Sequence, residues 1–457
     1  MVAVVAANRA RQCPRPVLRG QATTGAAADD IVAVLEGTPA TQACLQALDA
    51  HGQALHQAMV GDGSVEIGWP ARADTPVSNT PAGAALAELF EACAPTLALM
   101  SQATQHEDGC SPYRAGVRAQ PATLNAALPA MKLAAVVARD RLLRGEFDPG
   151  FDLALDAFRF GQDLIRGGVS LLQVVVASVT SEFATSVVEL GLSRPQPLGE
   201  ARLTRIEGEL ATLLATAPHP SSYLAGQREH VLLYTLMPRA KGAGWTPPGG
   251  WGAGEDEGAR RARLVHAGTI LGVDQAVLEW MAWQRAWEQV LSRCTPEAAF
   301  HRCRAELDTA RSALLALPVP DDQPPGGDST VRDELVRAQQ REQTIQILTR
   351  LAVSTVDSAL ARDARLRFRL AGLRLYAAHR RAAESAGDCP GLAWFDADDQ
   401  ADARRDPGSG APMAVEALGK GRFVLRPAAT AAAPDARTAQ GQPPPAVFVR
   451  CPPASPR

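Results

Sequence analysis

The chain has 457 residues, of which 46% are hydrophobic and only 5% aromatic, and its formal net charge at pH 7 is −3. Many Ala, Leu and Val residues with few aromatics are typical of a helical protein rather than a β-sandwich, and the length suggests two or three domains. The small net charge excludes a global attraction to nucleic acid or anionic lipid.

The first 29 residues are expected to form a flexible segment. Only about six apolar residues precede Arg9 and Arg11, whereas the apolar core of a secretory signal needs about 7–15 and a positive segment before it. The sequence as written therefore predicts no anchor, which makes the cytoplasm the default location and the cell envelope the alternative. A membrane association is expected only if an N-terminal anchor lies further upstream.

Apolar residues at steps of three and four predict helices along most of the chain. Several begin with the same pair, a capping Thr or Asp followed by Pro at the first helical position, as in Thr38-Pro39. The predicted helices span 39–60, 81–105, 121–144, 149–166, 168–192, 197–216, 220–237, 257–291, 295–316 and 330–386.

Two of these helices meet at an acidic Gly-Pro turn over residues 144–150. Asp148 is expected to cap the second helix, with Pro149 in its first turn. Leu155 and Phe158 lie on the apolar face of that helix. Because such a hairpin cannot bury its apolar face alone, the sequence predicts an all-α fold of stacked antiparallel helical hairpins, similar to a tetratricopeptide (TPR) array.

The most apolar predicted helix, around residues 171–192, is interrupted by Glu182 and Glu189. With Ser178 and Thr185 these glutamates form a narrow polar strip along one side. This pattern indicates a mostly buried helix of a folded protein rather than a membrane span.

Composition divides the chain into six parts. The predicted boundaries are a flexible segment (1–29), a helical-hairpin domain (30–237), a Gly/Trp loop (238–258), a second helical segment (259–386), a small β-hairpin module (387–426) and a disordered tail (427–457). Trp245 and Trp251 lie in the exposed loop and are candidate interaction residues.

The end of the second helical segment is strongly basic. Between residues 362 and 381 seven arginines accompany a single acidic residue, Asp363. Arg362, Arg365 and Arg369 are therefore candidates for a surface that binds a partner. The alternative is a solvated face, or one paired with acidic residues of the same fold.

Few residues suggest chemistry. Glu297 and His301 have the spacing of zinc ligands, but no second cluster supports them. The acidic stretch 396–402 lacks the Gly and Glu of a calcium-binding loop, and Asp156 is expected to pair with Arg159 instead of serving as an acid or base. The eight cysteines form no Cys-x-x-Cys motif and are expected to be reduced core residues, with disulfides as the minority alternative.

The only clear β pattern lies near the C-terminus, where residues 412–418 and 422–426 flank a short Gly loop. Before it stand Leu375-Tyr376, then Gly387-Asp388-Cys389-Pro390, then an Asp-Pro-Gly-Ser-Gly-Ala-Pro segment over 406–412. In these motifs the chain resembles a group of helical-repeat, TPR-like proteins of planctomycetes and myxobacteria whose C-terminal hairpin is similar to that of type II secretion pseudopilins. The resemblance implies a location in the cell envelope and no particular activity.

These patterns favour a non-enzymatic helical-repeat scaffold that presents a surface to an unknown protein partner, with no catalytic, cofactor or metal residues predicted. Nucleic acid is not expected as a partner. The alternatives are an envelope-associated accessory protein and an enzyme. An enzyme would have a pocket beside Trp280, Trp283 and Trp287, whose spacing is otherwise typical of a buried stripe.

Overall fold

The structure is a computed structural model that describes part of the chain and is mostly helical there. The described residues are 39–60, 76, 83–105, 122–166, 171–218, 361–397, 400–407, 410–419, 421–428 and 445–451. The predicted helices at 220–237, 257–291 and 295–316 lie outside these residues. The same holds for the tryptophans at 245, 251, 280, 283 and 287, and for Glu297 and His301.

Six helices occupy the described part of 39–218, close to the predicted bounds. They are α3 (Pro39–Val60), α4 (Gly83–Ala103), α5 (Ala122–Leu143), α6 (Phe147–Arg166), α7 (Leu171–Ser193) and α8 (Glu200–Ala215). A further helix covers residues 361–386 and is called the arginine helix below. The short α15 (Leu392–Phe395) follows it.

The predicted helical hairpin is formed by α5 and α6. Gly145 adopts a φ of 85°, and the N–H of Glu146 donates to the carbonyl of Arg141 at 2.9 Å, which closes α5. The expected capping role of Asp148 is wrong. Helix α6 begins earlier, at Phe147, and the Asp148 carboxylate instead accepts hydrogen bonds from Arg202 of α8.

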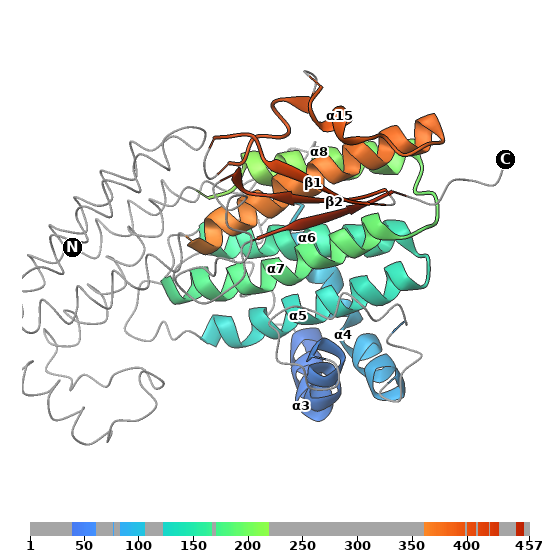
Figure 1. Ribbon diagram of the computed structural model, residues 1–457. Helices are drawn as coiled ribbons and strands as arrows, with labels where there is room; N and C mark the ends of the chain where they lie inside the picture. The colour runs from blue at the N-terminus through green and yellow to red at the C-terminus, as the bar shows by residue number, and fades with distance from the viewer. Residues whose placement is uncertain are drawn as a thin grey trace, which may run out of the picture.

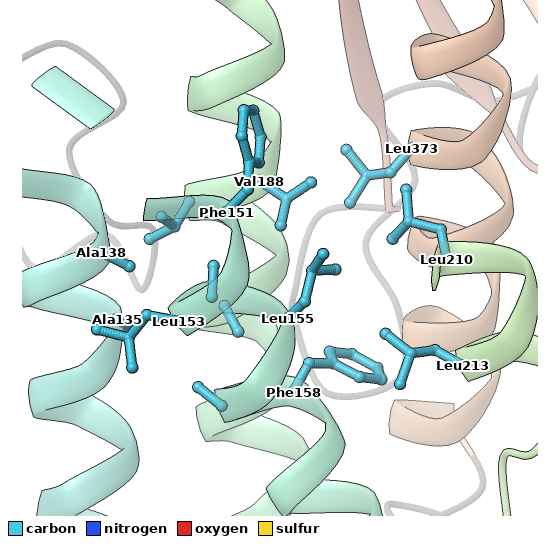
Figure 2. Packing of buried hydrophobic residues seen from close by; sticks show 14 of the residues in the cluster. Ala135, Ala138, Phe151, Leu153, Leu155, Phe158, Val188, Leu210, Leu213 and Leu373 are labelled. Atoms are coloured by element: carbon cyan, nitrogen blue, oxygen red, sulfur yellow. The ribbon is translucent and has the colours of Figure 1, made fainter. Parts of the chain in front are cut away.

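Helices α5, α6 and α7 pack against one another, and α3 packs on α4 (Figure 1). On α6, Leu155 and Phe158 point away from α5 toward Leu210 and Leu213 of α8 (Figure 2). Helices α6 and α7 can approach closely because residue 191 is a glycine. A Cβ at Gly191 would lie 2.5 Å from the ring of Phe151. These contacts form one buried apolar core.

By length and composition, α4 is the one described helix that could cross a membrane. In the structure its Leu86, Leu89 and Met100 are buried, and Cys93 is joined to Cys44 of α3. These contacts make α4 part of the helical core.

The C-terminal sheet has three antiparallel strands in the order β1 (Ala414–Gly419), β2 (Arg422–Arg426) and β3 (Val447–Arg450). The first two are the predicted hairpin. The third corrects the prediction of a disordered tail, since residues 447–450 form a paired strand.

The sheet lies along the arginine helix (Figure 1). Val447 and Leu425 approach Gly372 of that helix so closely that a Cβ there would lie 2.8 Å from the Val447 side chain. Val447 and Val449 are buried, whereas Phe448 between them points outward and is 55% exposed. The alternation in Val447-Phe448-Val449-Arg450 is that of a half-buried strand.

Candidate functional site

The arginine helix lies against the polar strip of α7. Arg365 lies 3.4 Å from Glu182, and Arg369 lies 2.8 Å from Glu189. The guanidinium of Arg369 also donates to the hydroxyl of Thr185 at 3.0 Å. The polar strip of α7 and the arginine helix, which are far apart in the sequence, therefore pair with each other across one helix–helix contact.

This contact leaves little of the candidate arginines exposed. The side chain of Arg365 is 19% exposed and that of Arg369 is 13% exposed, while Arg362 is half-buried. Burial lowers the pKa of Arg365, and the nearby Glu182 opposes that shift. Of the two alternatives left open for Arg365 and Arg369, a partner-binding face or an internally paired one, the structure shows the internal pairing.

At its C-terminal end the arginine helix holds the segment between α7 and α8. Arg380 is fully buried, and its guanidinium donates to the carbonyls of Leu192, Arg194 and Gln196. The same side chain pairs with Glu384 at 2.9 Å. Five donors in a fixed fork suit arginine to such a cluster of acceptors.

Glu384 completes this arrangement from the other side. Its carboxylate accepts the N–H groups of Leu198 at 3.0 Å and Gly199 at 2.8 Å. Burial raises the pKa of Glu384, but these hydrogen bonds and the Arg380 charge outweigh it and hold the pKa below its usual range. Arg380 thus binds carbonyl groups of the turn between α7 and α8, and Glu384 binds N–H groups of the same turn.

Ion pairs also join α6 to its neighbours. Asp148 binds Arg202, and this bond lowers the pKa of Asp148. Arg159 pairs with Asp156 at 3.3 Å, as predicted, and also with Glu209 of α8. Burial raises the pKa of Asp156, in part offset by that arginine and by hydrogen bonds. Asp148 and Asp156 therefore each pair with an arginine of the same fold.

The acidic stretch 396–402 was weighed as a calcium loop. Of its described members, Asp396 pairs with Arg404, and Asp402 lies 3.6 Å from Arg405. Both carboxylates therefore face arginines, which would oppose a bound cation.

A separate cluster, centred on His379, lies between the arginine helix and the described residues of 387–451. Its ring stacks on Phe395 with centroids 4.9 Å apart and meets Trp394 edge-on at 5.0 Å. Nε2 lies 3.2 Å from the carbonyl oxygen of Pro390. Because burial among these rings penalises the charged form, the pKa of His379 is lowered to about 4.

Two cysteines lie beside this histidine. Cys389 and Cys451 form a disulfide with Cα atoms 5.7 Å apart, and Cys44 and Cys93 form another at 4.5 Å. The expectation of reduced core cysteines is thus wrong for these four. A ring nitrogen of His379 and the sulfurs of Cys389 and Cys451 lie within 4.8 Å of one another.

This cluster is not predictable from the sequence because its members are far apart in the chain. Cys451 lies in the part assigned to a disordered tail, and 62 residues separate it from Cys389. The one available signal was the alternation of residues 447–450, which marks a strand that had to pair somewhere.

Comparison with known proteins gives no relative: no family model, no curated protein and no solved structure matches the chain.

Proposed function

We propose that this protein is a non-enzymatic binding protein whose C-terminal module, residues 387–451, presents an apolar surface to a protein partner. The observation that carries the proposal is the location of exposed apolar side chains. In the part of the chain that the structure describes, the large hydrophobic residues that are exposed are Leu392, Leu418 and Phe448, all in this module.

Phe448 is the strongest candidate contact because its strand is held on several sides. Its own N–H donates to Glu189 of α7 at 2.8 Å, and the carbonyl of Arg450 accepts the Tyr376 hydroxyl at 3.1 Å. The disulfide fastens the next residue, Cys451. An aromatic side chain on a rigid strand loses little conformational entropy on binding, which favours affinity.

The helical part serves in this proposal as the support. We further propose that the described helices are stacked as the antiparallel hairpins of a TPR-like array. The α5–α6 hairpin and its packing on α7 support this. Helix α7 contacts β3, and the arginine helix lies along the sheet.

The test is quantitative affinity capture from the source cell with Phe448→Ser as bait. The serine should reduce recovery of the partner at least tenfold relative to wild type. The matched control is Arg450→Gln, on the same strand and also exposed, which should retain capture. Equal recovery by Phe448→Ser and wild type, with both proteins folded by circular dichroism, would show that the module is not the binding surface.

A second candidate is an envelope-associated accessory protein. It is favoured by the two disulfides, because such bonds form and persist in oxidising compartments. Rapid acid quenching of cells, alkylation of the thiols in denaturant and peptide mapping test this, because Cys44 and Cys93 are buried in the folded chain. Protected Cys44, Cys93, Cys389 and Cys451 support the envelope, whereas alkylated cysteines place the protein in a reducing compartment.

A further inference from the structure

Three elements bring their side chains together at one end of the arginine helix. His379 comes from that helix, Cys389 from the segment after it, and Cys451 from the residue that follows β3. His379 is completely buried, whereas both cysteines are partly exposed. Both cysteine residues are thus partly open to solvent, while the ring is enclosed by its aromatic neighbours.

The histidine has one nitrogen without a partner. A carbonyl oxygen can only accept a hydrogen bond, so the contact with Pro390 places the proton of the neutral ring on Nε2. Nδ1 then carries a free lone pair. It is buried and makes no hydrogen bond among the described residues. A buried acceptor left unsatisfied is costly, and such an atom in a native site calls for a partner.

The spacing fits a metal ion. In a tetrahedral zinc site with Zn–S near 2.3 Å and Zn–N near 2.0–2.1 Å, two sulfurs lie about 3.8 Å apart and sulfur and nitrogen about 3.6 Å apart. The ligand atoms here all lie within 4.8 Å of one another. The Cα separation of 5.7 Å between the cysteines lets small rotations of their side chains open the sulfurs to that distance.

We propose that, once the Cys389–Cys451 disulfide is reduced, these two thiolates and a ring nitrogen of His379 bind a soft divalent cation such as Zn²⁺. Nδ1 is the ring nitrogen without a hydrogen bond, and Nε2 at the Pro390 carbonyl orients the ring in the way that outer-shell carbonyls orient metal-bound histidines. Three protein ligands leave a fourth position for water or another donor.

Gly421 leaves room beside the sulfurs. It has a φ of 66°, and a Cβ there would lie 3.3 Å from the sulfur of Cys389 and 3.2 Å from Cβ of Cys451. A larger residue would press on both cysteines and hinder the separation of their sulfurs. The turn between β1 and β2 thus provides the space that the reduced site needs.

Reduction of the Cys389–Cys451 disulfide requires an external reductant. A dithiol or a phosphine supplies two electrons, the S–S bond breaks, and each cysteine takes up one proton. Binding of the cation then releases those two protons as the thiolates form. Because the same sulfurs serve both states, disulfide and metal site exclude each other, and the redox poise of the compartment selects between them.

The test uses the purified full-length chain, reduced with a phosphine and freed of metal. Titration with Co²⁺ should give the absorption of tetrahedral thiolate-bound cobalt, and Zn²⁺ should displace it. The double variant Cys389→Ser/Cys451→Ser should lose this signal. His379→Gln should weaken Zn²⁺ binding at least about 100-fold, the upper end of what loss of an outer-shell partner costs. The matched control, Cys44→Ser/Cys93→Ser, removes the other reducible pair and should bind as wild type does.

A second measurement needs no variant. Zn²⁺ should protect Cys389 and Cys451 of the reduced wild-type chain from alkylation, compared with the same reduced chain without metal. The oxidised chain should bind no ion at this site. The proposal is overturned if the reduced, folded chain gains no protection at Cys389 and Cys451, or if His379→Gln and the serine pair bind as tightly as wild type.

Discussion

Replacement of Arg380 by Met should strongly destabilise the contact between the arginine helix and the α7–α8 turn. The side chain is completely buried and donates to three carbonyls, and it pairs with Glu384. Methionine fills most of the space but donates nothing. Hydrogen bonds to a charged group contribute about 1.5–3 kcal/mol each, and breaking a buried ion pair costs about 3–5 kcal/mol. Since these losses overlap, we expect the free energy of unfolding to fall by about 3–5 kcal/mol.

Urea denaturation followed by far-UV circular dichroism measures this loss. The matched control is Arg381→Gln on the same helix. The Arg381 side chain is 36% exposed and pairs with Glu207, so its loss should cost less than about 1 kcal/mol. Arg380→Lys should fall between the two, because it keeps the charge but not the fork of donors. This role of Arg380 is refuted if Arg380→Met unfolds within about 1 kcal/mol of wild type, or if Arg381→Gln is equally damaging.

Three other outcomes are expected. Leu155→Asp should abolish the cooperative urea transition because it places a carboxylate in the core. The volume-conserving Leu155→Met should lower the free energy of unfolding by less than about 1.5 kcal/mol. A folded aspartate variant would contradict the packing in Figure 2. Glu182→Gln should lower the free energy of unfolding by about 1–2 kcal/mol because Glu182 pairs with the partly buried Arg365. The control Glu91→Gln, at an exposed residue, should lower it by less than about 0.5 kcal/mol. Equal effects of the two variants would show that the Glu182–Arg365 pair does not stabilise the fold. In the oxidised protein, the pKa of His379 is about 4 when folded and 6.5 when unfolded, so the unfolded chain binds the extra proton. Stability should therefore be full above pH 6.5 and fall as pH drops toward 4, by about 3 kcal/mol, and His379→Gln should lack this dependence in pH-resolved melting.

The sequence predicted local structure well where local patterns determine it. The start of α3 follows from its Pro, and the β1–β2 hairpin follows from the Gly loop between its strands. The polar strip on α7 is visible in the sequence as a break in an apolar run. Partners across the fold were not predictable in this way. Nothing in the spacing of Glu182 or Glu189 points to arginines about 180 residues later.

The cysteine pairs show the same limit. Cys44 and Cys93 lie on two predicted helices, but only the packing of α3 on α4 brings them together. Strand β3 was missed because its composition was judged together with the Ala- and Pro-rich residues before it. A four-residue strand is stabilised by its partners, here β2, Gly372 and the disulfide, more than by its own propensity.

The most direct test of the account is a double-mutant cycle between Arg369 and Glu189, the pair that joins the basic helix to the polar strip. Urea unfolding of Arg369→Gln, Glu189→Gln and the double variant gives the coupling free energy between the two side chains. Contact at 2.8 Å with both side chains mostly buried predicts a coupling of about 1–3 kcal/mol. A coupling below about 0.5 kcal/mol would mean that the two do not meet, and would return Arg369 to the class of residues that bind a partner.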